Sequence, residues 1–153
     1  TGATPALASL GYFAFSGTMI AVRLVADRVV ARTGAVRFVR VATIVAVLGF
    51  AVVLAAPWPV AGVFGFAVVG LGVAGIVPVA WSAASRKQAD SPGQAVAAVA
   101  ACGYVGFLVE PALIGALATR IGLHWAMASA IVVALSLFAL APALQVVAVS
   151  DNR

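Results

Sequence analysis

Five long apolar runs, separated by short polar stretches, dominate this sequence. They cover residues 5–22, 38–56, 60–82, 96–118 and 123–147. A helix needs about 20 apolar residues to cross the hydrocarbon core of a bilayer, because it rises ~1.5 Å per residue. Each run approaches or exceeds that length. The pattern therefore predicts an all-α membrane protein, built as a bundle of five transmembrane helices.

The composition also indicates a chain surrounded by lipid. Hydrophobic residues make up 65% of its 153 residues, and charged residues only 8%. Soluble domains carry about 25% charged residues, and one of this size has too much surface for so few charges. We therefore expect the lipid bilayer as a partner of the chain. A β-barrel is disfavoured because its strands alternate apolar and polar positions, whereas these runs are continuously apolar.

Several other classes of protein lack support in the residues. The net charge is +5, but the basic residues lie between apolar runs and form no dense stripe for nucleic acid. Cys102 is the only cysteine and His124 the only histidine, so no metal-binding pattern is present. The sequence also has no nucleophile–base pair and no phosphate loop. We expect no metal, no cofactor, no nucleic-acid partner and no enzymatic activity.

The basic residues occupy alternate loops. Five arginines lie in and beside the first loop, Arg86 and Lys87 lie in the third, and Arg153 ends the chain. The second loop has none, and the fourth has only Arg120. By the positive-inside rule the basic loops and the C-terminus are cytoplasmic and the N-terminus is outside. Because the chain starts at Thr1 without a basic leader, we expect it to be a piece of a longer protein.

Glycine and proline concentrate in the third and fourth runs. The residues of interest are Gly70, Gly72, Pro78, Gly106, Pro111 and Gly115. Small residues let helices approach closely, and Gly or Pro breaks bend helices and free backbone carbonyls. Two interpretations stay open: the glycines only pack helices, or the two kinked helices line or gate a pathway.

Three further side chains lie at a depth that suits a cavity. They are Trp81, Ser82 and Tyr104. We place Trp81 and Ser82 at or near the cytoplasmic end of a pathway helix. For Trp81 an interfacial anchor is the alternative to a substrate contact, because tryptophan is common at membrane interfaces.

Glu110 is the one acid well inside any of the five runs. A charged carboxylate at such a depth costs at least ~2.5 kcal/mol. We therefore expect Glu110 to be protonated, paired or turned toward a watery cavity. Its role is either packing against another helix or the coupling of transport to protons, and the residues leave both open.

The first loop carries Arg23-Leu24-Val25-Ala26-Asp27-Arg28, followed by Arg32-Thr33-Gly34. A positively charged cytoplasmic loop that sets the membrane topology would explain the arginines, but it would not explain Asp27. This acid can pair with Arg23 one turn earlier if the helix continues, or it can cap the next turn. Gly34 is expected to end a short helical piece in the left-handed conformation.

This stretch resembles the loop motif of the major facilitator superfamily, Gly-x-Leu-x-Asp-Arg-x-x-Gly-Arg-Arg in idealised form. The matching positions are Val25, Asp27, Arg28 and Arg32, whereas Arg23 stands where the motif has glycine. A mostly uncharacterised bacterial subgroup carries an Arg-Leu-x-x-Asp-Arg variant. Later stretches resemble the tenth and eleventh helices of that subgroup, with Glu110 in place of a usual glycine.

The resemblance implies that the five runs are helices 8 to 12 of a twelve-helix transporter. Residues 1–153 would then form an incomplete C-terminal bundle, and the N-terminal half would be absent. It further implies a secondary transporter of the bacterial inner membrane, a symporter or antiporter that moves a small solute by alternating access. The resemblance also implies that helix 10 lines the cavity and that helices 8 and 11 face the N-terminal half.

The same resemblance assigns a cytoplasmic gate, made of Arg23, Asp27, Arg28 and Arg32. The alternative is that these residues only set topology. The alternative for the whole chain is a non-transporting membrane subunit, or a truncated relic, that acts through helix packing.

Overall fold

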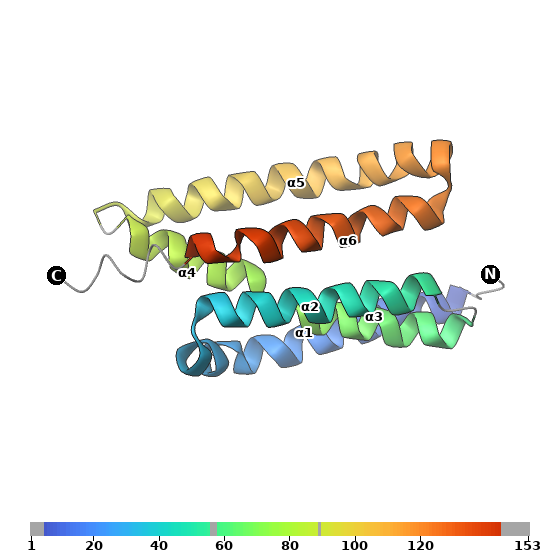
Figure 1. Cartoon of the computed structure of the whole chain (residues 1–153), viewed down its shortest axis with the longest axis horizontal. Helices are drawn as coiled ribbons and strands as arrows, with labels where there is room; N and C mark the ends of the chain where they lie inside the picture. The colour runs from blue at the N-terminus through green and yellow to red at the C-terminus, as the bar shows by residue number, and fades with distance from the viewer. Residues whose placement is uncertain (1–4, 56–57, 89, 145–153) are drawn as a thin grey trace.

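The structure, a computed structural model, describes residues 5–55, 58–88 and 90–144, and within these ranges it is helical. The helices are α1 (Pro5–Thr33), α2 (Ala35–Ala55), α3 (Pro59–Val73), α4 (Ile76–Lys87), α5 (Pro92–Ile121), α6 (Leu123–Leu140) and the short η1 (Ala141–Leu144). They run up and down along one axis (Figure 1). The all-α fold predicted from the apolar runs is confirmed.

Five of these segments are long and apolar enough to cross a membrane. They are Ser9–Thr33, Ala35–Ala55, Pro59–Lys87, Pro92–Ile121 and Leu123–Leu140. The third combines α3 and α4, which a short break separates. The chain is therefore a multi-pass membrane protein.

The first helix continues well beyond the apolar run. We expected the first span at residues 5–22, but α1 extends through the arginine-rich motif to Thr33. The helix stops at Gly34, whose φ of 80° is costly for residues with a Cβ. The Gly34 N–H donates to the carbonyl of Val30 at 2.8 Å, which caps the helix. The motif is thus helical, and the turn into α2 is very short.

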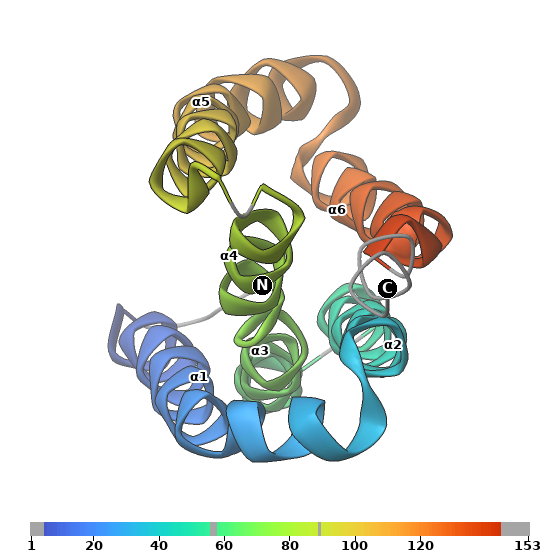
Figure 2. The ribbon, with the colours of Figure 1, turned by 90° about the vertical axis from the view of Figure 1, so that its left-hand side faces the viewer.

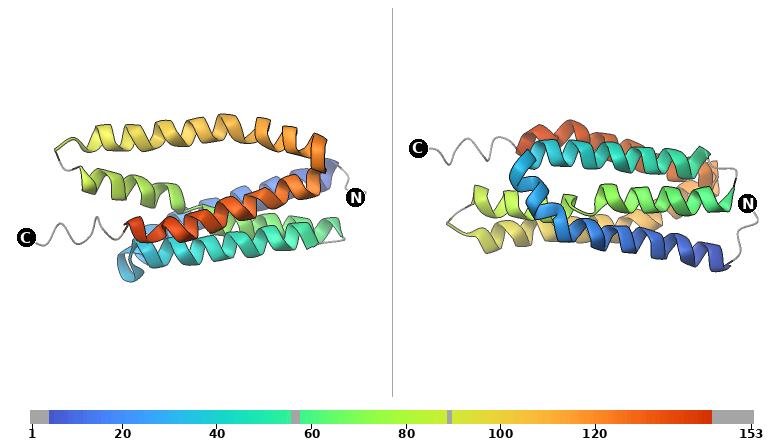
Figure 3. Two further views of the ribbon diagram at one scale, coloured as in Figure 1. Left: turned by 45° about the horizontal axis from the view of Figure 1, so that its top comes forward. Right: turned by 90° about the horizontal axis from the view of Figure 1, so that it is seen from below.

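The helix α3 lies between α1 and α2 (Figures 2 and 3). Glycine makes this close approach possible on both sides. A Cβ at Gly70 would collide with the Phe15 carbonyl oxygen and with Thr18 Oγ1 on α1, and one at Gly72 would collide with the Ala46 backbone on α2. Thr18 Oγ1 also lies 2.9 Å from the Ala67 carbonyl oxygen, so its hydroxyl can donate across the interface. Gly70 and Gly72 therefore have the contacts of packing residues.

The remaining helices are attached more loosely. The helix α6 packs on α2, and α5 packs on α4 and α6. Arg40 of α2 places its guanidinium carbon 5.4 Å from the centre of the Phe138 ring of α6, a cation–π distance. None of the described residues of α5 is buried. The bundle is therefore tight around α3 and open around α5.

The packing of α3 leads to a prediction about stability. Gly72→Leu should lower the melting temperature of the purified protein in detergent by several degrees, because overpacking typically costs about 1–3 kcal/mol. The matched control is Gly62→Leu on the same helix, where a Cβ meets nothing within 4 Å. Melting can be followed by size-exclusion chromatography after heating. Equal melting of the two variants would contradict the packing role.

Candidate functional site

The break between α3 and α4 lies at Ala74 and Gly75. Pro78 follows four residues after Ala74 and has no N–H, so it cannot donate the helical hydrogen bond that the Ala74 carbonyl would receive. Arg23 of α1 takes this place, since its Nε donates to the Ala74 carbonyl oxygen at 3.3 Å. In a hydrocarbon environment an unpaired carbonyl is expensive. The arginine that departs from the family glycine therefore satisfies a carbonyl that proline leaves free.

A small cavity joins the motif of α1 to α4. Its volume is about 180 Å³, and it is lined by Asp27, Val30, Ala31, Pro78, Val79, Ser82 and Arg86. The structure thus brings Asp27 and Ser82, both predicted as site residues, to one place. Arg28 and Arg32 are exposed and do not line this cavity.

Arg86 is a member of this cavity that the sequence interpretation had used only for topology. Pro78, Ser82 and Arg86 are each four residues apart, so they share one face of α4. That spacing was the signal that could have revealed Arg86. The face carries a hydroxyl and a cation beside the carboxylate of Asp27.

Trp81 and Tyr104 are not brought into this group. Trp81 is 41% exposed and Tyr104 is 70% exposed. Neither lines the small cavity or the larger one described next. The interfacial-anchor interpretation of Trp81 thus stays open.

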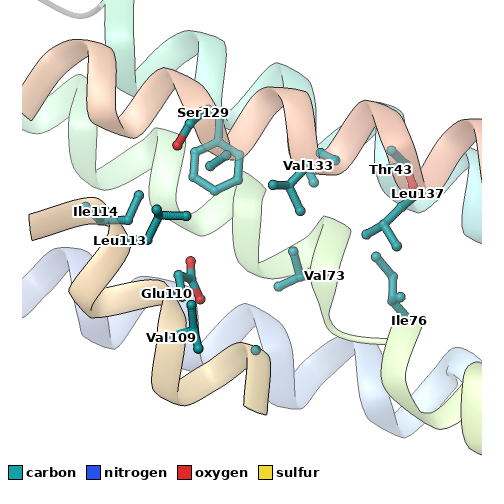
Figure 4. Close-up of a pocket in the computed structure, with 15 residues that line it drawn as sticks. Thr43, Val73, Ile76, Val109, Glu110, Leu113, Ile114, Ser129, Val133 and Leu137 are labelled. Atoms are coloured by element: carbon teal, nitrogen blue, oxygen red, sulfur yellow. The ribbon is translucent and has the colours of Figure 1, made fainter. Parts of the chain in front are cut away.

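A larger cavity of about 460 Å³ lies between α5 and α6 and is closed at its base by α2 and the α3–α4 break (Figure 4). Its lining is Thr43, Ala46, Phe50, Val73, Ile76, Gly106, Val109, Glu110, Leu113, Ile114, Ser129, Ala130, Val133, Ala134 and Leu137. The carboxylate of Glu110 points from α5 into this space, toward the side occupied by α6 (Figure 4). It is the one ionisable group in the lining.

The two hydroxyls of the larger cavity are already engaged as donors. Thr43 Oγ1 donates to the Val39 carbonyl at 2.8 Å, and Ser129 Oγ donates to the Ala126 carbonyl at 2.6 Å. While these bonds last, both hydroxyl oxygens can accept but cannot donate. The lining therefore offers acceptors to a protonated Glu110 and no side-chain donor to an ionised one.

The glycines of α5 differ from those of α3. Built Cβ atoms at Gly103, Gly106 and Gly115 meet nothing within 4 Å. Pro111 lies within α5, which continues through it to Ile121. No neighbouring helix in the part of the chain that the structure describes comes into close contact with these three glycines. Among the described residues no group of three His, Cys, Asp or Glu side chains could hold a metal ion.

Comparison with known proteins gives three informative relatives. The membrane protein MosC of Rhizobium meliloti is 37% identical over 124 residues, which is 81% of this chain and 30% of that protein. An uncharacterized MFS-type transporter of Yersinia pestis is 31% identical over 117 residues, covering 76% of this chain and 30% of the relative. An uncharacterized transporter of Sinorhizobium fredii is 35% identical over 111 residues, covering 72% and 29%.

These matches agree with the motif on α1. The chain belongs to the major facilitator superfamily of membrane transporters, as the sequence pattern indicated. It spans about 30% of the length of the curated relatives that it matches, which is consistent with a C-terminal half of such a protein. No family model and no solved structure matches the chain.

The contact of Arg23 with Ala74 gives a prediction that a double-mutant cycle can test. Arg23→Leu should destabilise the protein by about 1–3 kcal/mol, because it leaves a carbonyl unsatisfied. Pro78→Ala supplies an N–H to the same carbonyl, so Arg23→Leu should cost much less in a Pro78→Ala background. Unfolding is measured in detergent for the four proteins of the cycle.

The control for this cycle is Arg32→Leu, an exposed arginine in the last turn of the same helix. Its cost should not depend on residue 78. Additive effects of Arg23→Leu and Pro78→Ala would show that the arginine does not act on the Ala74 carbonyl.

Proposed function

We propose that this chain is the C-terminal part of a secondary transporter that moves a small solute across the bacterial inner membrane by alternating access. In this proposal residues 1–153 form an incomplete bundle whose spans are helices 8 to 12, and the N-terminal half completes the pathway. The homology to longer proteins named as transporters supports it.

The observation that carries the proposal is the junction of α1 with the broken helix α3–α4. In alternating access one helix bundle rocks or gates against the other around a fixed binding site. Here Arg23 of α1 donates to the Ala74 carbonyl at the break. Asp27, one turn further along α1, lines the same cavity as Ser82 and Arg86 of α4. The proposed gate motif therefore lies against the kinked helix that we assign to the pathway.

The proposed orientation places this junction at the cytoplasmic face. The end of α1, the start of α2 and the end of α4 lie at one end of the bundle (Figure 1). Their basic residues are Arg23, Arg28, Arg32, Arg37, Arg40, Arg86 and Lys87. Trp58 and Arg120 lie at the opposite end. The positive-inside rule then makes the basic end cytoplasmic and the N-terminus external.

The gate function of Asp27 is testable in the complete transporter. Asp27→Asn should lower solute transport by at least about fivefold, because coupling free energies between such elements are typically about 1–3 kcal/mol. Expression and membrane insertion should be unchanged, since the arginines that set topology remain. The matched control is Asp90→Asn, an exposed acid in the α4–α5 connection. Normal transport by Asp27→Asn would remove the gating proposal.

Proton coupling is proposed for Glu110, with packing as the alternative. Glu110→Gln keeps the size of the side chain and removes its ionisation. If Glu110 couples transport to protons, the variant should lose uptake driven by a pH gradient and retain counterflow exchange at equal pH. Both are measured with the labelled solute in proteoliposomes. Uptake that still follows the pH gradient would leave Glu110 with the packing role.

A further inference from the structure

Arg37 and Arg40 lie in the first two turns of α2, at the basic end of the bundle (Figure 1). Both side chains are exposed. No hydrogen bond or ion pair joins either guanidinium to another residue that the structure describes. At about 31 Å, the 21 residues of α2 match the thickness of the hydrocarbon core. The first turns of α2 therefore lie where the core meets the lipid headgroups, and the two cations there lack an anionic partner among the described residues.

The Phe138 ring of α6 orients one of these cations. The Arg40 guanidinium carbon lies 5.4 Å from the centre of this ring. A ring in this position interacts with the flat face of the guanidinium and leaves the N–H groups at its edge free to donate. A phosphate group can accept two parallel hydrogen bonds from such an edge. Arg40 is thus held in an orientation that suits a phosphate.

Exposed aliphatic side chains continue the arginine face along α2. Val41, Ile44 and Leu48 follow Arg37 at intervals of four, three and four residues, so they share its face. They are 49% to 61% exposed, and we call them the α2 stripe. The distance along the helix from Arg37 to Leu48 is about 16 Å. This is close to half of the ~30 Å hydrocarbon core, which is the reach of one acyl chain in its leaflet.

A second helix fits this face less well than a lipid does. Helices that approach closely in a bilayer use small residues, as α3 does at Gly70 and Gly72, whereas the α2 stripe consists of valine, isoleucine and leucine. A second copy of the chain, related by a two-fold axis along the membrane normal, would bring its own Arg37 and Arg40 to the same level. Like charges placed opposite each other repel, so this contact would be unfavourable.

We propose that Arg37, Arg40 and Phe138 form, together with the α2 stripe, a binding site for an anionic phospholipid. Its phosphate contacts the two guanidinium groups, and one of its acyl chains lies along the stripe. The negative charge of the headgroup favours this class of lipid over a zwitterionic one. The site needs only a chain embedded in a membrane, so it is independent of the proposed transport of a solute.

Fluorescence quenching in the complete transporter tests this site. Cys102 and any other cysteine are replaced by Ala, and a bimane fluorophore is attached to Leu48→Cys on the α2 stripe. The protein is reconstituted in phosphatidylcholine vesicles in which a fixed fraction is phosphatidylglycerol with brominated acyl chains, and brominated phosphatidylcholine calibrates the quenching. The control probe is Val132→Cys, which is 68% exposed on α6 and does not belong to the stripe. We expect brominated phosphatidylglycerol to be enriched at least about fivefold at residue 48 and not at residue 132.

Substitutions at the proposed headgroup contacts show whether this enrichment depends on them. Arg40→Gln should lower the enrichment about fivefold, because it removes one of the two cations that hold the phosphate. Phe138→Leu should lower it by a smaller factor, since the charge remains and only the orienting ring is lost. The matched control is Lys87→Gln, which removes one exposed positive charge from the same end of the bundle. It should leave the enrichment unchanged.

Equal quenching by the two brominated lipids at residue 48, or full enrichment in Arg40→Gln, would overturn the site. An equal loss in Lys87→Gln would overturn it as well, because it would indicate a diffuse attraction to the basic end in place of a defined contact. Each variant is first checked for a single size-exclusion peak. If Arg40→Gln does not fold, Arg37→Gln provides the same test, since this exposed side chain has no hydrogen bond or ion pair to another described residue.

Discussion

The position of α3 depends on the absence of a Cβ where it meets its two neighbours. Lipid tails are as apolar as leucine, so helices in a bilayer associate through close packing and interhelical hydrogen bonds. Gly70 meets α1 and Gly72 meets α2, only two residues apart on the same helix. A side chain at either position would push α3 away from one neighbour. The close approach also brings the Ala67 carbonyl within hydrogen-bonding distance of the Thr18 hydroxyl.

The break between α3 and α4 leaves a backbone carbonyl without its helical hydrogen-bond donor, and a side chain from a distant part of the chain takes the donor's place. Pro78 leaves the Ala74 carbonyl without its helical donor, and Arg23, fifty-one residues earlier than Ala74, donates to it. A glycine, as in the family motif, could not do so. The same helix carries Asp27 into the small cavity with Ser82 and Arg86. One face of α1 therefore stabilises the bend, and the next turn supplies the charge beside it.

The amino-acid sequence predicts the helices well because hydropathy and length are local properties. It predicted five spans. It singled out Ser82 and Glu110 by residue type and depth, and Asp27 as an acid among the arginines of the first loop. It did not predict that α1 continues to Thr33, because the arginines end the apolar run without ending the helix, and only Gly34 stops it. The contact of Arg23 with Ala74 could also not be predicted from the sequence, because it depends on how α1 and α3 pack.

Glu110 is a second case in which the sequence predicts the position of a residue but not its contacts. Its depth was evident from the sequence, but the direction of its carboxylate depends on the face of α5 that meets α6. Since the nearby hydroxyls act as donors to their own helices, a protonated Glu110 can find acceptors in the larger cavity, whereas an ionised one needs a donor from outside the described residues. The partners that Glu110 can bind in this cavity therefore depend on which faces of α5 and α6 meet, and the sequence alone does not place those faces.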